Sequence, residues 1–165
     1  MTSNKKKKIG KKAMLFSTAF LFLLVCVMIL TFFQQKQAYF LQIYLPYEDE
    51  VYFETEVTVN DVFYHEYIHS VELSPVREYY KINEQYQMVA TESWTQSFGA
   101  GLPYEAKDEL EMKDGFIIIK QERLIEHLNI LPSHLFPHSF HVGEETVDLS
   151  GELNGERLRI RVITK

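Results

Sequence analysis

The sequence predicts an all-β domain, a small sandwich or partly open barrel of about seven or eight strands, preceded by one N-terminal transmembrane helix. Three features lead to this prediction: a long uncharged apolar run near the start, repeated two-residue alternation after it, and two dipeptides typical of hairpin turns. The expected organisation is a basic cytoplasmic tail at residues 1–12, the helix at 13–33, a tether at 34–38 and the β domain at 39–165.

The predicted transmembrane helix is the apolar run of residues 13–33, which contains no charged side chain. At about 1.5 Å per residue it is about 30 Å long, the thickness of the hydrocarbon core of a bilayer. Because positively charged flanks stay in the cytoplasm, we expect a single-pass protein of the cell membrane with its C-terminal domain outside. The lysines that precede the run are Lys5, Lys6, Lys7, Lys8, Lys11 and Lys12.

A cleaved signal peptide is the alternative for this segment. Its cleavage site requires small residues at positions −3 and −1, and the nearest candidate, which ends at Ala38, has Lys36 at −3. A lipoprotein site at Cys26 would follow Leu24 and Val25, where a small residue is required. An uncleaved anchor is therefore favoured.

Charge is divided sharply along the chain. Residues 1–12 hold six of the 17 Lys and Arg, and all 23 Asp and Glu follow residue 47. The remainder therefore has 11 basic against 23 acidic side chains, a formal charge of −12 with His neutral. This charge disfavours nucleic acid and anionic membrane surfaces as partners of the domain. The one cysteine, Cys26, lies in the apolar run, so the domain has no disulfide within the chain.

Strand patterns follow one another after residue 38. Asp114-Gly115 and Asn154-Gly155 predict two-residue hairpin turns, because their residues tolerate positive φ. In the last strand, Leu158, Ile160 and Val162 face one side and three arginines the other. The spacing in 122–131 favours a helix, and 134–143 is predicted to be a loop. The predicted strands are 39–45, 51–59, 62–71, 76–82, 85–95, 110–112, 116–119, 147–153 and 156–163.

The segment from His65 to His69 reads H-E-x-x-H, the pattern in which two His on a helix bind zinc and the Glu activates water. Its surroundings have strand composition, and on a strand Glu66 points away from His65 and His69. We therefore expect no metal and no cofactor, and keep a zinc-dependent hydrolase using His65, Glu66 and His69 as an alternative. A second cluster, His127, His134, His138 and His141, is interpreted as part of a loop held by its Phe residues rather than as a metal site.

The segment from Ser97 to Pro103 carries Gly99 and Gly101 on either side of Ala100. Such a turn can form an anion-binding nest, but a tight bend between strands is the simpler interpretation. No arrangement of a nucleophile with a base stands out, so we expect that the protein is not an enzyme.

Three segments in order resemble the bacterial family called domain of unknown function 1850 (DUF1850), over about residues 50–150. They are Tyr67–Val76 (YIHSVELSPV), Ser97–Pro103 (SFGAGLP) and Asp114–Phe116 (DGF). The resemblance implies an exported or membrane-anchored protein, associated with TRAP-type transporters of the TAXI class, without an established activity. Arg77 stands where the family commonly has an acid, and the pattern does not require His65 or Glu66. The family positions are His69, Ser70, Glu72, Pro75, Glu78, Gly99, Gly101 and Pro103.

We therefore expect a membrane-anchored, extracytoplasmic accessory or binding protein, with a membrane transporter complex as the implied partner. Its candidate ligand or partner site is His69, Ser70, Glu72, Glu78, Gly99 and Gly101. Binding of a small solute by the domain remains a third hypothesis, beside the accessory role and the hydrolase. The ligand, the partner and the oligomeric state do not follow from the sequence.

Overall fold

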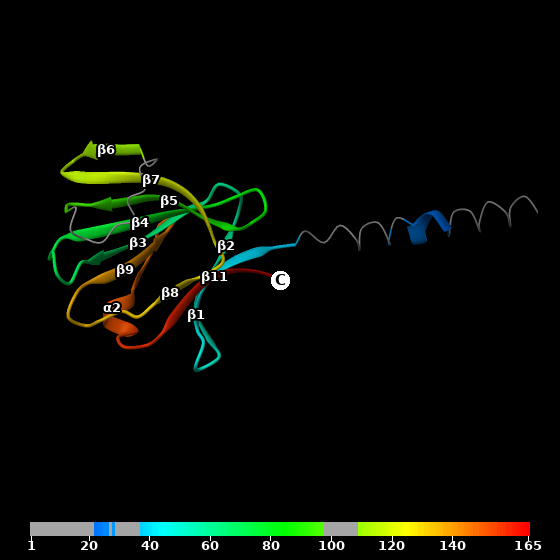
Figure 1. Ribbon diagram of the computed structural model, residues 1–165. Helices are drawn as coiled ribbons and strands as arrows, with labels where there is room; N and C mark the ends of the chain where they lie inside the picture. The colour runs from blue at the N-terminus through cyan, green and yellow to red at the C-terminus, as the bar shows by residue number, and fades with distance from the viewer. Residues whose placement is uncertain (1–21, 27, 29–36, 98–108) are drawn as a thin grey trace, which may run out of the picture. The chain divides into compact units, whose positions relative to one another are not determined.

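The computed structural model describes residues 22–26, 28, 37–97 and 109–165 (Figure 1). The chain divides into two compact units, 1–37 and 38–165. In the first unit, residues 22–26 are helical. Within the described residues, none of the helices has both the length and the apolar character needed to cross a membrane. Most of the predicted span at 13–33 lies outside the described residues.

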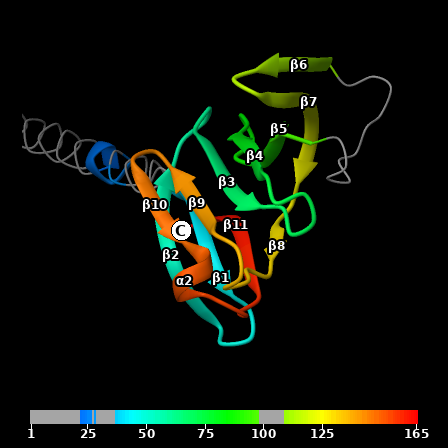
Figure 2. The ribbon, with the colours of Figure 1, turned by 90° about the vertical axis from the view of Figure 1, so that its left-hand side faces the viewer.

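The second unit is built from two antiparallel sheets, which confirms the prediction of a mostly β domain. The smaller sheet has the strand order β2-β1-β11-β8 and the larger β10-β9-β3-β4-β5-β7-β6 (Figures 1 and 2). The described residues form eleven strands rather than the predicted seven or eight. Their bounds are β1 Tyr39–Leu45, β2 Glu50–Val57, β3 Val62–Ile68, β4 Pro75–Ile82, β5 Met88–Thr95, β6 Glu109–Lys113, β7 Phe116–Ile125, β8 Leu128–Ile130, β9 His138–Val142, β10 Glu145–Asp148 and β11 Leu158–Thr164, with the short helix α2 at Leu149–Glu152.

One hydrophobic core lies between the two sheets, because alternate side chains of each strand face it. Ile43 of β1 and Ile160 of β11 are fully buried on one side, as is Phe140 of β9 on the other. The rings of Phe53 and Phe140 meet edge to face across the sheets, with centroids 6.3 Å apart. The predicted alternation of the last strand is confirmed, with its inward residues Leu158 and Ile160 at 0% exposure.

The two predicted hairpins have different outcomes. Asp114 and Gly115 join β6 to β7 with φ of 50° and 80°, as a type I′ turn requires, so the first hairpin is confirmed. The second prediction is wrong, because β10 pairs with β9 whereas β11 pairs with β1 and β8. Between β10 and β11 the chain forms α2, whose first amides donate to the side chain of Asp148.

Two further local predictions are wrong. Residues 122–131 are not a helix: β7 runs to Ile125 and pairs with β5 out to Met88, and β8 follows at 128–130. The helical spacing of the leucines there is overridden by strand pairing. The segment 134–143 is not all loop, since 138–142 form β9 between β10 and β3.

Candidate functional site: a half-buried histidine and glutamate network beside a groove

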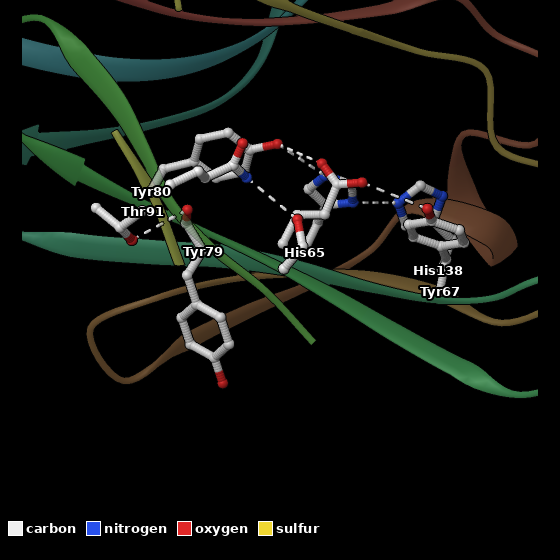
Figure 3. A network of polar contacts seen from close by, with 9 residues as sticks. His65, Tyr67, Tyr79, Tyr80, Thr91 and His138 are labelled. Atoms are coloured by element: carbon white, nitrogen blue, oxygen red, sulfur yellow. Dashed lines mark hydrogen bonds and ion pairs between the residues drawn. The ribbon is translucent and has the colours of Figure 1, made fainter. Parts of the chain in front are cut away.

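Strand alternation places polar side chains on the core face of the larger sheet. On β3, Phe63, His65 and Tyr67 face the core, and on β4 Glu78 and Tyr80 do so. His65 lies opposite Glu78 in the antiparallel register, so the two meet side by side. Figure 3 shows the side chains of His65, Tyr67 and Tyr80 together, with Tyr79 pointing to the other side of the sheet.

A continuous polar network joins five side chains of β3, β4 and β9. The Tyr80 hydroxyl donates to Glu78 Oε2 at 2.7 Å, and the Tyr67 hydroxyl lies 3.4 Å from Glu78 Oε1. Glu78 Oε2 is also 3.6 Å from His65 Nε2. The other ring nitrogen of His65, Nδ1, is 3.1 Å from Nε2 of His138 on β9. The network thus runs from β4 through β3 to β9.

Burial and mutual contact shift the pKa values in this network. Burial opposes ionisation of Glu78, but hydrogen bonds and charge from His65, and hydrogen bonds from Tyr80 and Tyr67, outweigh it and lower its pKa to about 2. Burial, with the nearby His65, lowers the pKa of His138 to about 4. Burial and the Glu78 charge raise the pKa of Tyr67 to about 12 and that of Tyr80 also. At neutral pH, Glu78 is therefore ionised and His138 neutral.

The outer end of the network opens on a groove of about 200 Å³. Tyr67 and His138 lie in its wall and connect it to Glu78. His69 and Ser70, which the family resemblance identifies, line the same groove. Its other lining residues are mainly apolar: Ile68, Leu131, Ser133, Phe136 and Pro137. A groove with apolar walls and a few convergent polar groups is the usual form of a ligand site.

The turn after β3 explains why His69 lines this groove and Glu72 does not. β3 ends at Ile68, and His69 accepts hydrogen bonds at Nδ1 from the amides of Val71 and Glu72, 3.3 and 3.1 Å away. Leu73 completes the turn with φ of 51°. Glu72 is exposed and accepts from the Ser97 hydroxyl at 2.8 Å.

The structure therefore divides the predicted site. His69 and Ser70 line the groove, Glu78 lies in the network behind it, and Glu72 reaches Ser97 instead. Gly99 and Gly101 lie outside the described residues. Pro75 begins β4 and pairs with Ile68.

The H-E-x-x-H segment does not form one cluster of ligands. Glu66 faces the opposite side of β3 from His65 and makes an ion pair with Arg77. His65 directs both ring nitrogens into the network, and His69 belongs to the turn beyond the strand. Over residues 37–97 and 109–165, no three His, Cys, Asp or Glu gather in a way that could hold a metal ion.

The other histidines also separate. His141 faces the outer side of the sheet, where its ring stacks on Tyr64 at 4.4 Å and contacts Ser139 and Thr146. Nδ1 of His134 lies 3.3 Å from Oδ1 of Asn154. Of this cluster, His138 alone contacts the described network, although the sequence predicts a loop there. The available signal was its place two residues before Phe140, on the apolar side of a strand.

Comparison with known families bears on this region. A family model described as "Domain of unknown function (DUF1850)" matches residues 63–149, just over half of the chain. This chain belongs to the DUF1850 family. No curated protein and no solved structure matches it.

The DUF1850 region runs from β3 to the start of α2. It therefore contains the whole larger sheet, the network and the groove-lining segments. β1, β2 and β11 lie outside it, although they complete the core that buries Phe63 and Phe140. The resemblance found from the motif segments is confirmed over this range.

Proposed function

We propose that this DUF1850 protein is a membrane-anchored, extracytoplasmic binding protein that holds a small solute, or a segment of a partner, in the groove between the end of β3 and residues 131–138. The observation that carries the proposal is the place of Tyr67 and His138, which belong at once to the groove wall and to the polar network. Any group bound there contacts side chains already fixed in position, which lowers the cost of binding.

The geometry supports binding more than hydrolysis. A hydrolytic zinc site needs a carboxylate beside its histidines, and Glu66 is held on the other side of the sheet by Arg77. Family resemblance supports a membrane transporter complex as the partner, and the uncharged run at 13–33 behind six lysines supports the anchor.

Filling the groove tests the binding proposal. Single small solutes would be screened by thermal unfolding of the full-length protein in neutral detergent. A solute that occupies the groove raises the melting temperature of the wild type. At a concentration of 100 times its Kd, it adds about 2.7 kcal/mol to the free energy of unfolding. Ser70→Trp, at an exposed position in the groove wall, removes that rise. Gln85→Trp, exposed but outside the groove, retains it. Equal responses of the two variants would contradict the proposal.

The predicted topology has its own test, because Cys26 is the only cysteine. In a Cys26→Ser background, Glu84→Cys places a thiol on the exposed surface of the domain and Ser3→Cys places one in the lysine tail. A membrane-impermeant maleimide added to intact cells labels the first variant and leaves the second unlabelled until the cells are lysed. The reverse pattern would place the domain in the cytoplasm. Loss of the Ser3→Cys thiol from the mature protein would indicate a cleaved signal peptide.

A further inference from the structure

A second groove, of about 330 Å³, lies on the smaller sheet and is lined by positively charged side chains, whereas the domain as a whole is acidic. Arg157 and Arg159 line it, next to Asn129 and Tyr47. Its apolar walls are Pro46, Ile130 and Leu131. No carboxylate is among its lining residues, although the chain beyond residue 12 has a formal charge of −12.

Over residues 37–97 and 109–165, neither Arg157 nor Arg159 forms an ion pair. Arg159 donates from Nε to Asn129 Oδ1 at 3.3 Å, which leaves the two terminal nitrogens of its guanidinium to contact a ligand. Arg157 lies over the ring of Tyr47, with Cζ 5.8 Å from the ring centroid.

Two carboxylates of β2 and the turn before it have other partners. Glu54 accepts hydrogen bonds from Gln42 and Lys165, each at 2.5 Å. Asp49 accepts from the Tyr44 hydroxyl at 2.6 Å. The third arginine of the row, Arg161, donates to Gln42 and lies 3.8 Å from the Tyr44 ring centroid. Among the described residues, Arg157 and Arg159 therefore line the groove without an ion-pair partner.

We propose that this arginine groove binds the phosphate group of an organic phosphomonoester, with the organic part against Ile130, Leu131 and the Tyr47 ring. Guanidinium groups hold phosphate oxygens by pairs of parallel hydrogen bonds. Two adjacent positive charges match the charge of about −1.5 to −2 on a phosphomonoester at pH 7 better than the single charge of a carboxylate. The side-chain amide of Asn129, whose oxygen accepts from Arg159, has its NH₂ group as a further donor.

This site is independent of the one proposed above for solute binding. It is formed by the β1–β2 turn, β8 and the start of β11, whereas the first groove is formed at the end of β3. Only Leu131 lies in the walls of both.

Isothermal titration of the full-length protein in neutral detergent with phenyl phosphate tests the proposal. Saturable binding is expected, with benzoate binding more weakly. Arg157→Gln and Arg159→Gln each weaken phenyl phosphate binding by about tenfold or more, since each removes charge-assisted hydrogen bonds. Arg123→Gln, an exposed arginine of β7 outside the groove, has the same change of charge and retains the wild-type affinity.

Three results would overturn the proposal: absence of saturable phenyl phosphate binding, benzoate affinity equal to that for phenyl phosphate, or equal weakening by Arg123→Gln. Unfolding midpoints of the variants serve as the check on folding. Arg157 is exposed and has no hydrogen bond to a described residue, so Arg157→Gln is expected to fold as the wild type does.

The source of the phosphate is then distinguished in lipid nanodiscs. Phosphatidic acid presents a phosphomonoester headgroup, and phosphatidylcholine does not. If the natural occupant is that headgroup, phenyl phosphate binds more weakly in discs that contain phosphatidic acid than in phosphatidylcholine discs. Equal affinity in the two kinds of disc supports a soluble phosphate ester.

Discussion

At the scale of single residues, the shifted pKa values of Glu78 and His138 couple the stability of the domain to pH. Glu78 has a pKa of about 2 when folded against 4.5 as its ordinary value, so its contribution is present above pH 4.5 and is lost as pH falls toward 2. His138 has a folded pKa of about 4 against 6.5, so folding favours its neutral form. Its contribution is present above pH 6.5 and is lost as pH falls toward 4.

We therefore predict that stability falls in two successive steps on acidification. Urea unfolding measured between pH 8 and pH 2 gives the free energy of unfolding at each pH. His138→Asn removes most of the step between pH 6.5 and 4, and Glu78→Gln removes most of the step between pH 4.5 and 2. At pH 7, Glu78→Gln costs about 2 kcal/mol, because the amide removes the negative charge and replaces one of the two acceptor oxygens of the network by an NH₂ donor.

Two matched variants control for the chemistry of the substitutions. His127→Asn and Glu84→Gln change the same residue types outside the network and leave both steps in place. A single step, or steps that the network variants do not alter, would show that other groups control acid unfolding.

The sequence predicts part of the site residue by residue, but not all of it. Alternation on β3 and β4 indicates that His65 and Glu78 point to the same side as Phe63 and Tyr80. It does not indicate that β9 lies beside β3, because the pairing of distant strands depends on the whole topology. The sequence therefore predicts a loop at His138, whereas in the structure His138 lies on β9 and completes the network.

At the scale of elements, the β6–β7 hairpin depends on positive φ at two successive residues. Gly115 has φ of 80°, and a Cβ added there would meet no atom within 4 Å. The cost of Gly115→Ala is therefore a backbone cost, about 1 kcal/mol, without a steric clash. Chemical denaturation measures it directly. Gly115→Asn is expected to lose less, because Asn tolerates the left-handed region; an equal or larger loss would argue against this account.

The elements around each turn explain why Asp114-Gly115 predicted its hairpin correctly and Asn154-Gly155 did not. Gly155 also has positive φ, 78°, and the Glu156 amide donates to the Leu153 carbonyl at 3.1 Å, so a turn forms, although Asn154 does not have positive φ. The residues before it leave the sheet, because Asp148 accepts hydrogen bonds from the amides of Ser150 and Gly151, at 3.0 and 2.9 Å, and starts α2. A turn signal thus specifies the local backbone, whereas the partner of the strand after it depends on what precedes the turn.

At the scale of the whole molecule, one hydrophobic core holds the β unit together. Every member of the core cluster lies between Leu41 and Ile160. The only cysteine is Cys26, so no disulfide stabilises the β unit. Its stability therefore depends on the packing of the two sheets, and the residues outside the DUF1850 match supply three of the four strands of the smaller sheet, β1, β2 and β11.

We predict that residues 38–165 alone unfold cooperatively, with the urea midpoint that the β unit has in the full-length protein in the same neutral detergent. The deletion removes none of the core side chains. A deletion that extends through residue 45 is the matched test. It removes β1, which lies between β2 and β11 and contributes Leu41 and Ile43, both fully buried. Loss of two such side chains costs about 2–5 kcal/mol each, and loss of the strand also breaks two ladders, so this variant is expected to be unfolded. A lower midpoint for residues 38–165 would mean that the first unit contributes to the stability of the second.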